Sequence, residues 1–442
     1  MTDLLSLGEC ALRADGADAV EVLLTRDDTA LTRFAESQVH QNTARVDGEA
    51  RVRAVVDGSR IGVVATNDLT PAGLRDAAAA AVEAARVTPP DQEFAGLAPP
   101  AAYGTAGLDD PATAAASPAD RAALVGTMLR HLGAGMVAAG TAETGRHEVA
   151  VVNTLGVAAY HATTRASLTV LVSGEDSTGW GEHTDAAISA LDADAAAARA
   201  VAKVERGRAP VDVEPGDWQV VLEPPAVSAL VEWLCWLAFC GRDVVEGRSA
   251  VSGKLGERIC SPLVTIVDDP LSPSMLGQPF DAEGTPKQPL DLVRDGVAAG
   301  AAHDRMSARL GGTESTGHAY PAPNPQGGIP GNPSMLPGDA SPDDLVAGCG
   351  RALLVTRFHY TNALHPLATT ITGMTRDGTF LVEDGEIVGG VRNLRFTQSV
   401  LAALSAVEAV GRDTALGSEF GGAVRVPALR IGSFHFSSAT TF

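Results

Sequence analysis

The segment from Pro224 to Cys240 restricts the possible folds of this chain more than any other. Between Leu230 and Phe239 the residues are apolar on nearly every side of a helix, and two of the four tryptophans lie there. A helix that is apolar all round is normally buried, because none of its faces carries the polar side chains that water would solvate. The segment therefore predicts a core helix.

A chain of 442 residues is longer than a single hydrophobic core can usefully grow, so two domains are expected. A boundary is predicted near Arg206, because a new run of strand and turn signals begins there with Trp218. We expect an N-terminal α+β domain over residues 1–207 and a C-terminal β-rich domain over residues 208–442. Aromatic residues make up only 4% of the chain, so alanine, valine and leucine should provide most of the core.

The N-terminal domain is expected to contain a mixed sheet with helices. Strands are predicted over residues 19–24 and 30–35, where apolar and small or polar residues partly alternate. A hairpin is predicted over residues 50–66, because Asp57-Gly58 supplies the positive φ angles of a tight turn. Further strands are predicted over residues 148–153 and 157–172.

Helices are predicted on either side of these strands. The first is expected over residues 4–14, and Thr70 should cap a second, since proline follows at the first helical position. Ser117 is predicted to cap a third for the same reason, and a fourth is expected over residues 194–204. The second half of this domain thus repeats the helix and strand order of the first.

The C-terminal domain is expected to be largely antiparallel around the buried helix. Strands are predicted over residues 263–268, 351–356, 379–383 and 386–391, with a hairpin turn at Asp384-Gly385. Residues 315–343 are too rich in proline for a helix or a central strand, and long irregular loops are usually functional or disordered. This loop is either a cleft-lining loop or a mobile surface segment.

The formal net charge of −21 disfavours partners that carry phosphate groups, so we expect neither nucleic acid nor an anionic membrane as a partner. The acidic start does not resemble a secretory signal, and no apolar run is long enough to span a membrane. Five cysteines without a CxxC spacing indicate neither a disulfide framework nor a zinc ribbon. We expect a cytoplasmic protein.

Four segments, in this order, resemble the TldD/PmbA family of metalloproteases, and its TldE/PmbA branch more than TldD. They are Val264-Thr-Ile-Val-Asp-Asp-Pro, Pro279-Phe-Asp-Ala-Glu-Gly-Thr-Pro, Glu314-Ser-Thr-Gly-His and Ile371-Thr-Gly-Met-Thr-Arg-Asp-Gly-Thr-Phe-Leu-Val-Glu-Asp-Gly-Glu. The resemblance implies a TldD–TldE pair that degrades small, poorly folded peptides or trims modified-peptide precursors. It also implies that TldD holds the zinc, through a His-Glu-x-x-x-His helix and a C-terminal cysteine.

The corresponding helix of this chain departs from that motif. Glu232 and Leu237 occupy the two histidine positions, Trp233 occupies the position of the catalytic glutamate, and no cysteine follows Cys349. A catalytic zinc needs about three protein ligands and a carboxylate near its bound water. We therefore expect no catalytic residue, no metal ligand and no cofactor in this chain, with zinc in a TldD-like partner subunit.

Candidate contacts to a peptide substrate come from the C-terminal domain. The spacing of His359 and His365 is not a metal-ligand pattern, Arg376 could bind a peptide terminus, and the long loop could present side-chain donors. Satisfied histidines, a turn-stabilising ion pair and ordinary turn chemistry are the structural alternatives. The predicted peptide-binding residues are His318, Asn332, His359, Tyr360 and Arg376.

Two other functions remain open from the sequence. The chain could be a self-sufficient metallopeptidase with an unconventional site that uses His359, His365 or Cys349. It could also be a regulatory homodimer that binds peptides without protease activity. Our leading prediction is the non-catalytic subunit of a heteromeric zinc protease.

Overall fold

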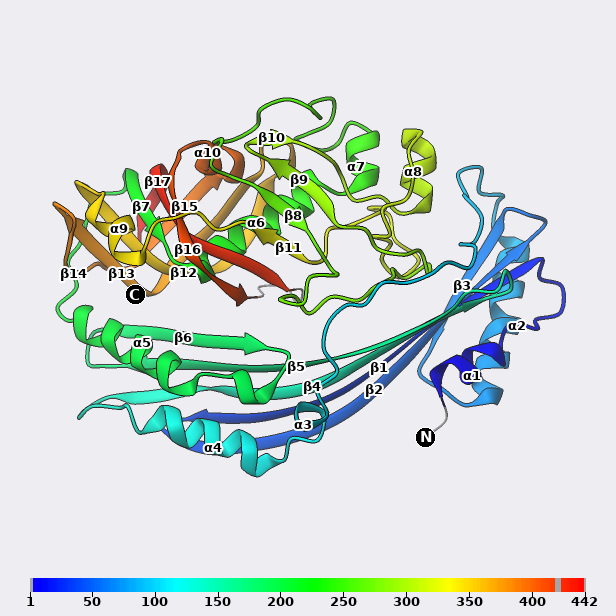
Figure 1. The fold of residues 1–442 in the computed structure, drawn as a ribbon, viewed down its shortest axis with the longest axis horizontal. Coiled ribbons are helices and arrows are strands. Elements are labelled where there is room, and N and C mark those ends of the chain that lie inside the picture. The colour runs from blue at the N-terminus through cyan, green and yellow to red at the C-terminus, as the bar shows by residue number, and fades with distance from the viewer. Residues whose placement is uncertain (1–2, 418–422, 441–442) are drawn as a thin grey trace.

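A computed structural model describes residues 3–417 and 423–440. Its strands form two sheets, one of six strands in the order β3-β2-β1-β4-β5-β6 and one of eleven strands. The six-stranded sheet is long and curved, and the C-terminal part of the chain lies over its inner face (Figure 1). Both parts combine helices with a largely antiparallel sheet, which confirms the α+β class.

The N-terminal part contains the six-stranded sheet and its helices. Its strands are β1 (Ala19–Ala35), β2 (Gln38–Val56), β3 (Arg60–Thr66), β4 (Val137–Asn153), β5 (Ala158–Ser173) and β6 (Thr178–Asp185). Its helices are α1 (Leu4–Glu9), α2 (Pro71–Val87), α3 (Pro111–Ala114), α4 (Pro118–Leu129), η1 (Ile188–Ala190) and α5 (Ala193–Arg206). Where a mixed sheet was expected, every pairing in this sheet is antiparallel.

Strand β1 runs without a break through residues 26–29, so the prediction of separate strands over 19–24 and 30–35 was wrong. The polar residues that suggested a break lie in the middle of the sheet, where one face meets a cavity rather than an apolar core. Strand β2 likewise begins at Gln38, well before the predicted hairpin arm. The hairpin turn itself is confirmed, because Asp57 and Gly58 have φ values of 50° and 73°.

The helices cover the outer face of the sheet at both ends. Apolar residues from α1 and α2 pack on β1 to β3, and apolar residues from α4 and α5 pack on β4 to β6. The predicted caps are confirmed, since Thr70 accepts a hydrogen bond from the Gly73 amide and Ser117 forms a capping box with Asp120. Because helices occupy the outer face, the inner face is left for the C-terminal part.

The two edge strands approach their helices closely at glycines. A Cβ at Gly62 of β3 would collide with the backbone of Ala81 and Ala85 in α2, and a Cβ at Gly179 of β6 would collide with the backbone of Ala200 in α5. Each contact is to backbone atoms, so no side-chain rotation can relieve it. The same glycine contact therefore sets the distance between helix and strand in both halves of the sheet.

Replacing Gly62 with alanine is expected to lower the free energy of unfolding by about 1–3 kcal/mol, the usual cost of overpacking. The matched control is Gly126→Ala, because Gly126 lies in α4 and a Cβ there would meet nothing within 4 Å. That control should stabilise the protein by up to about 1 kcal/mol through helix propensity. Chemical denaturation of both variants measures the difference, and equal effects would contradict the packing argument.

The C-terminal part contains the eleven-stranded sheet. Its strands are β7 (Gly216–Leu222), β8 (Ile266–Asp268), β9 (Leu290–Arg294), β10 (Val297–Ala298), β11 (Pro333–Met335), β12 (Arg351–His365), β13 (Thr370–Glu383), β14 (Glu386–Gly390), β15 (Leu394–Ser399), β16 (Val407–Gly417) and β17 (Val424–Ala439). Its helices are α6 (Pro224–Ala238), α7 (Gly241–Val245), α8 (Arg305–Gly311), α9 (Pro342–Ala347), η2 (Pro366–Ala368) and α10 (Val400–Ser405). The pairings are mostly antiparallel, but β12 runs parallel to β7 and β11 parallel to β17.

Helix α6 is the predicted core helix, and it packs against β12 and β17. Ten of its residues are buried, and all of these except Ser228 and Glu232 join the largest apolar cluster of the described residues, which includes Phe358, Phe396 and Phe434. Burial on every side is not observed, because Trp236 is 41% exposed. The apolar pattern extends around the helix, but the packed elements leave the side of Trp236 uncovered.

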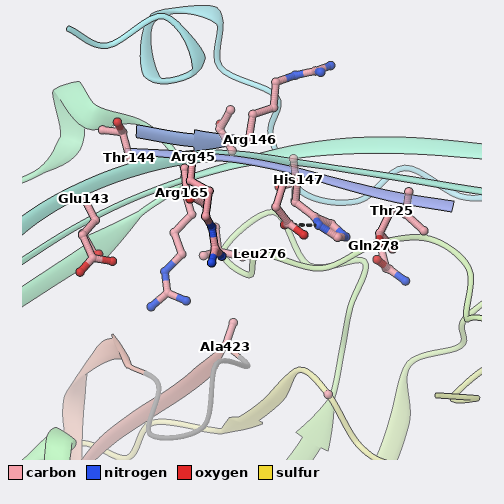
Figure 2. A pocket seen from close by; sticks show the side chains of 18 of the residues that line it. Thr25, Arg45, Glu143, Thr144, Arg146, His147, Arg165, Leu276, Gln278 and Ala423 are labelled. Atoms are coloured by element: carbon pink, nitrogen blue, oxygen red, sulfur yellow. Dashed lines mark hydrogen bonds and ion pairs between the residues drawn. The ribbon is translucent and has the colours of Figure 1, made fainter. Parts of the chain in front are cut away.

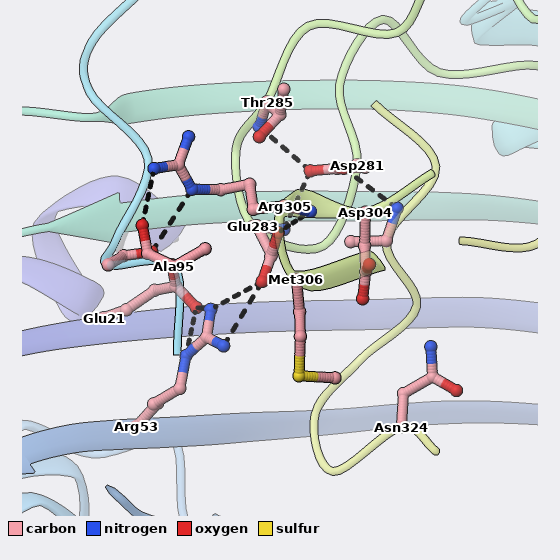
Figure 3. Close-up of polar contacts among 12 residues, drawn as sticks. Glu21, Arg53, Ala95, Asp281, Glu283, Thr285, Asp304, Arg305, Met306 and Asn324 are labelled. Atoms are coloured by element: carbon pink, nitrogen blue, oxygen red, sulfur yellow. Dashed lines mark hydrogen bonds and ion pairs between the residues drawn. The ribbon is translucent and has the colours of Figure 1, made fainter. Parts of the chain in front are cut away.

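Two clusters of polar contacts join the N-terminal sheet to the C-terminal part. In the first junction, Arg53 of β2 pairs with Glu21 of β1 and with Glu283, and the backbone amide of Arg305 donates to Glu283 (Figure 3). In the second junction, Asp377 of β13 accepts hydrogen bonds from Thr178 of β6 and from Arg357. The Arg357 guanidinium also lies 4.0 Å from the centre of the Trp180 ring.

Among the helices of residues 3–417 and 423–440, none has the length and apolar character needed to cross a membrane.

All five cysteines lie within these ranges, and each is a free thiol. Burial raises the pKa of Cys240 and of Cys260 to about 12, which keeps both thiols protonated at neutral pH.

Candidate functional site

A cavity of about 1050 Å³ lies between the inner face of the six-stranded sheet and the loops of the C-terminal part. Its lining residues come from β1, β2, β4 and β5 on one side and from residues 276–287, 319–332 and 423 on the other. A cavity of this size can receive several residues of an extended peptide. The loop over residues 315–343 therefore lines a cleft, as one of its two interpretations proposed.

The sheet side of the cavity follows from the two-residue period of its strands. Alternate side chains of β1, including Thr25, Asp27 and Thr29, point inward, and the register of the sheet adds residues directly opposite them. Arg45 of β2 and Arg165 of β5 point into the cavity, whereas Arg146 points away from it (Figure 2). This wall is consequently polar and carries two inward guanidinium groups.

One hydrogen-bonded pair on this wall is set by strand register. Asp27 and His147 are cross-strand partners, and His147 Nδ1 lies 2.7 Å from Asp27 Oδ1. The hydrogen bond with His147 is the main cause that lowers the pKa of Asp27, and the charges of His147 and Arg45 act in the same direction against partial burial. Asp27 therefore stays ionised at neutral pH and is already paired.

The opposite wall is organised by Asp268, a fully buried carboxylate at the end of β8. Its Oδ1 lies 3.2 Å from His318 Nε2, and its Oδ2 accepts a hydrogen bond of 2.8 Å from the backbone amide of Asn332. Burial acts to raise the pKa of Asp268, but the hydrogen bond and charge of His318, together with Lys287 and the Asn332 amide, hold it below its usual value. One ionised carboxylate thus fixes two loops that line the cavity.

Two of the predicted peptide-binding residues lie at this wall. Asn332 lines the cavity, while His318 is fully buried behind it, between Asp268 and the hydroxyl of Thr316. Ala319 and Tyr320, which follow His318, do line the cavity. His318 thus positions the wall, and Asn332 is the one predicted residue whose position allows direct contact with a ligand in the cavity.

The other three predicted residues lie elsewhere, on the β12–β13 hairpin, and none of them lines the cavity. Tyr360 is 72% exposed and has a φ of 55°. Arg376 lies opposite Arg357 in the strand register, and its Nε lies 3.9 Å from Asp377 Oδ1. Burial, together with the charges of Arg376 and Arg357, lowers the pKa of His359, which favours a neutral imidazole at pH 7. Peptide contact by this group stays a prediction.

The residues of α6 do not fit a zinc site. Glu232 is buried, Leu237 packs against the apolar core, and the Trp233 indole donates a hydrogen bond to the Thr361 hydroxyl. Within residues 3–417 and 423–440, no group of three or more histidine, cysteine, aspartate or glutamate side chains is placed to hold a metal ion. The Cys349 thiol donates to the Leu345 carbonyl, and the exposed His365 accepts from the Ala368 amide.

Sequence reasoning missed most of the cavity. Arg45, Arg165, Lys287 and Tyr320 all line it, and none was a candidate. A signal was present in the alternation of Thr25, Asp27 and Thr29, because polar residues at every second position mark a strand face that meets water. The positions of Lys287 and Tyr320 could not be inferred in this way, since both lie on irregular loops.

The fold and cavity define a class of protein: a two-sheet α+β protein whose cavity is enclosed by an antiparallel sheet and the loops of a second domain. Three family models match the chain, described as PmbA/TldA metallopeptidase domain 1 over residues 20–85, central domain over residues 112–208 and C-terminal domain over residues 215–438. Together they cover most of the sequence. The chain belongs to the PmbA/TldD metallopeptidase family.

Curated relatives and a solved structure agree with this assignment. The chain is 29% identical over 208 residues to a metalloprotease of Methanothermobacter thermautotrophicus, and 29% identical over 170 residues to the metalloprotease TldD homolog of Haemophilus influenzae. These matches span 47% and 37% of this chain, and only 45% and 34% of the relatives. The crystal structure of TldE from Thermococcus kodakarensis superposes with a TM-score of 0.88 at 21% identity, covering 98% of this chain and 99% of that one, and it shows the shared fold.

Proposed function

We propose that this chain is the non-catalytic, TldE/PmbA-like subunit of a heteromeric zinc metallopeptidase and that its partner, a TldD-like chain, holds the zinc. The observation that carries the proposal is helix α6. The sequence resemblance aligns this helix with the family's zinc-binding helix, and in this chain Glu232 is buried and Trp233 is hydrogen-bonded to Thr361. The helix therefore serves packing, and the chemistry of peptide hydrolysis falls to the partner.

The cavity and its border support a role in holding peptides. Residues Gln38 to Asp47 of β2 are exposed and pair on one side with β1, whereas β3 joins β2 only from Ala50 onward. No described strand occupies the other side of this segment, and three of its residues line the cavity. An extended peptide that adds to such an edge is held by backbone hydrogen bonds, which suit many sequences alike.

The proposed substrates are small, poorly folded peptides and modified-peptide precursors, and the proposed compartment is the cytoplasm. The free cysteines accord with a reducing compartment. The net charge of −21 is the reason for proposing that neither nucleic acid nor an anionic membrane is a partner.

Co-expression with a TldD-like chain from the same genome tests the proposal. We expect a stable heteromer with one zinc per partner chain, peptidase activity that is lost when this chain is omitted, and no loss of zinc from the partner on omission. The matched control replaces the partner's helix histidines with alanine, which should abolish both zinc and activity. Stoichiometric zinc in this chain alone, with peptide cleavage that survives the control, would overturn the proposal in favour of a self-sufficient peptidase.

A further inference from the structure

The ammonium group of Lys287 lies at the cavity without a hydrogen-bond or ion-pair partner among the described residues. The backbone amide of Lys287 donates to the Pro279 carbonyl, which fixes the loop, and the ammonium lies close to Gly331 on the neighbouring segment. Burial lowers the pKa of Lys287, while the charges of Asp268 and Asp281 oppose that shift. A partly buried cation of this kind gains from a nearby anion.

The two buried carboxylates near Lys287 already have other partners. Asp268 interacts with His318 and the Asn332 amide, and Asp281 accepts hydrogen bonds from the backbone amides of residues 283, 285 and 319. Their attraction to Lys287 therefore acts through space, without contact. The ammonium donors remain free for a ligand.

Two further donors lie on the same wall of the cavity as Lys287. Neither the Asn332 side-chain amide nor the Tyr320 hydroxyl has a partner among the described residues, and both residues line the cavity. Across the cavity, Arg45 and Arg165 point inward from the sheet (Figure 2). The lining thus combines the cations Lys287, Arg165 and Arg45, of which Arg45 also pairs with Asp47, with the carboxylates of Asp27 and Glu143.

We propose that Lys287, Asn332 and Tyr320 form a subsite that binds a carboxylate of the peptide, with Arg45 and Arg165 attracting the anion from the opposite wall. An ammonium group and neutral donors on one wall match the acceptor oxygens of a carboxylate. The carboxylate comes either from the C-terminus of the peptide or from an aspartate or glutamate side chain. This inference rests on the proposed function, because it requires that the cavity receives peptides.

The test compares binding of dye-labelled peptides to the full-length chain by fluorescence anisotropy. One pair of peptides differs only in a free or amidated C-terminus, and a second amidated pair differs only in an internal Asp or Asn. We expect about tenfold tighter binding of the carboxylate form in one pair, the value typical of a hydrogen bond to a charged group. The pair that shows the preference identifies the source of the carboxylate.

Lys287→Met should abolish this preference by weakening only the carboxylate form. Lys254→Met is the matched control, because it removes the same charge from a lysine whose Nζ donates to the Ala250 carbonyl, outside the cavity. If Lys287→Met weakens the binding of both peptide forms equally, Lys287 only balances the negative charges of Asp268 and Asp281. That result would overturn the subsite. Asn332→Ala, with a smaller loss of the same preference, replaces Lys287→Met if that variant does not fold.

If the chain alone binds no peptide, the ratio of KM values within each pair is measured in the heteromer. If the active heteromer shows no preference for the carboxylate form, the subsite is overturned while the proposed subunit role stands. The carboxylate subsite and the subunit role can therefore fail independently. A carboxylate preference in the chain alone, together with full activity of the partner without it, would retain the subsite and reject the subunit role.

Discussion

Replacing Asp268 with alanine is expected to lower the free energy of unfolding by about 3–5 kcal/mol, the cost of removing one partner from a buried charged contact. The change leaves His318 and the backbone amide of Asn332 without their acceptor. It also removes a negative charge that attracts Lys287. Because both loops of the cavity wall depend on this residue, peptide binding should fall together with stability. Urea denaturation and peptide anisotropy measure the two effects.

Asp269→Ala is the matched control for this variant. Asp269 is partly exposed, and its side chain accepts one hydrogen bond, from the Leu271 amide. Its loss should cost about 1 kcal/mol. Similar losses of stability in the two variants would show that Asp268 does not organise the wall. The pKa of Asp268 lies below its usual value, so its stabilising contribution should be complete near neutral pH and should disappear as the pH falls below about 4.

The second large effect is expected at the first junction, where Arg53→Met should also cost about 3–5 kcal/mol. The variant leaves Glu21 and Glu283 without the guanidinium that lies between them (Figure 3). Burial is the main cause that raises the pKa of Glu21 to about 7, and Arg53 opposes this shift. Without Arg53 the pKa of Glu21 should rise further.

The sign of the pH dependence follows from these pKa values. A carboxyl group whose pKa is raised by folding holds a proton that the unfolded chain releases, so its contribution to stability is lost as the pH rises through the folded-state value. The destabilisation by Arg53→Met should therefore be larger at pH 8 than at pH 6. Glu21→Gln in the same chain should recover part of it and reduce the pH dependence.

Arg51→Met is the control for the junction. Arg51 lies on the same face of β2 and also reaches the C-terminal part, where it donates to the Ala322 carbonyl, but its side chain is 33% exposed. Its loss should cost about 1 kcal/mol and should not depend on pH in this range. If Arg53→Met behaves like Arg51→Met at both pH values, the buried junction does not hold the two parts together.

Local signals predicted the local structure well. The Asp57-Gly58 and Asp384-Gly385 turns, the Thr70 and Ser117 caps and the core helix are each determined by neighbouring residues, and all are present. The sequence did not predict that β1 is continuous, because its central residues are polar. Such residues suggest a loop if both faces of the strand are assumed to be covered by an apolar core. Here one face meets the cavity.

The candidate site was harder to predict than the fold. The prediction of His318 and Asn332 rests on their position in a proline-rich loop, and both residues lie at the cavity wall. The prediction of His359, Tyr360 and Arg376 rests on their residue type, and the hairpin carries them to a different surface. The sequence does not indicate Lys287, because its surroundings come from segments that meet only in the folded chain, namely the loops around Asp268, Asp281 and Asn332.

The two junctions together have a mechanical consequence. One ties the β1–β2 end of the sheet to Glu283, and the other ties β6 to residues 357 and 377. A sheet that is attached to the C-terminal part at both ends cannot open by a rigid-body rotation about a single hinge. Widening the cavity must instead bow the long strands between the fastenings, so the stiffness of β1 and β4 sets how bulky an occupant the protein can admit.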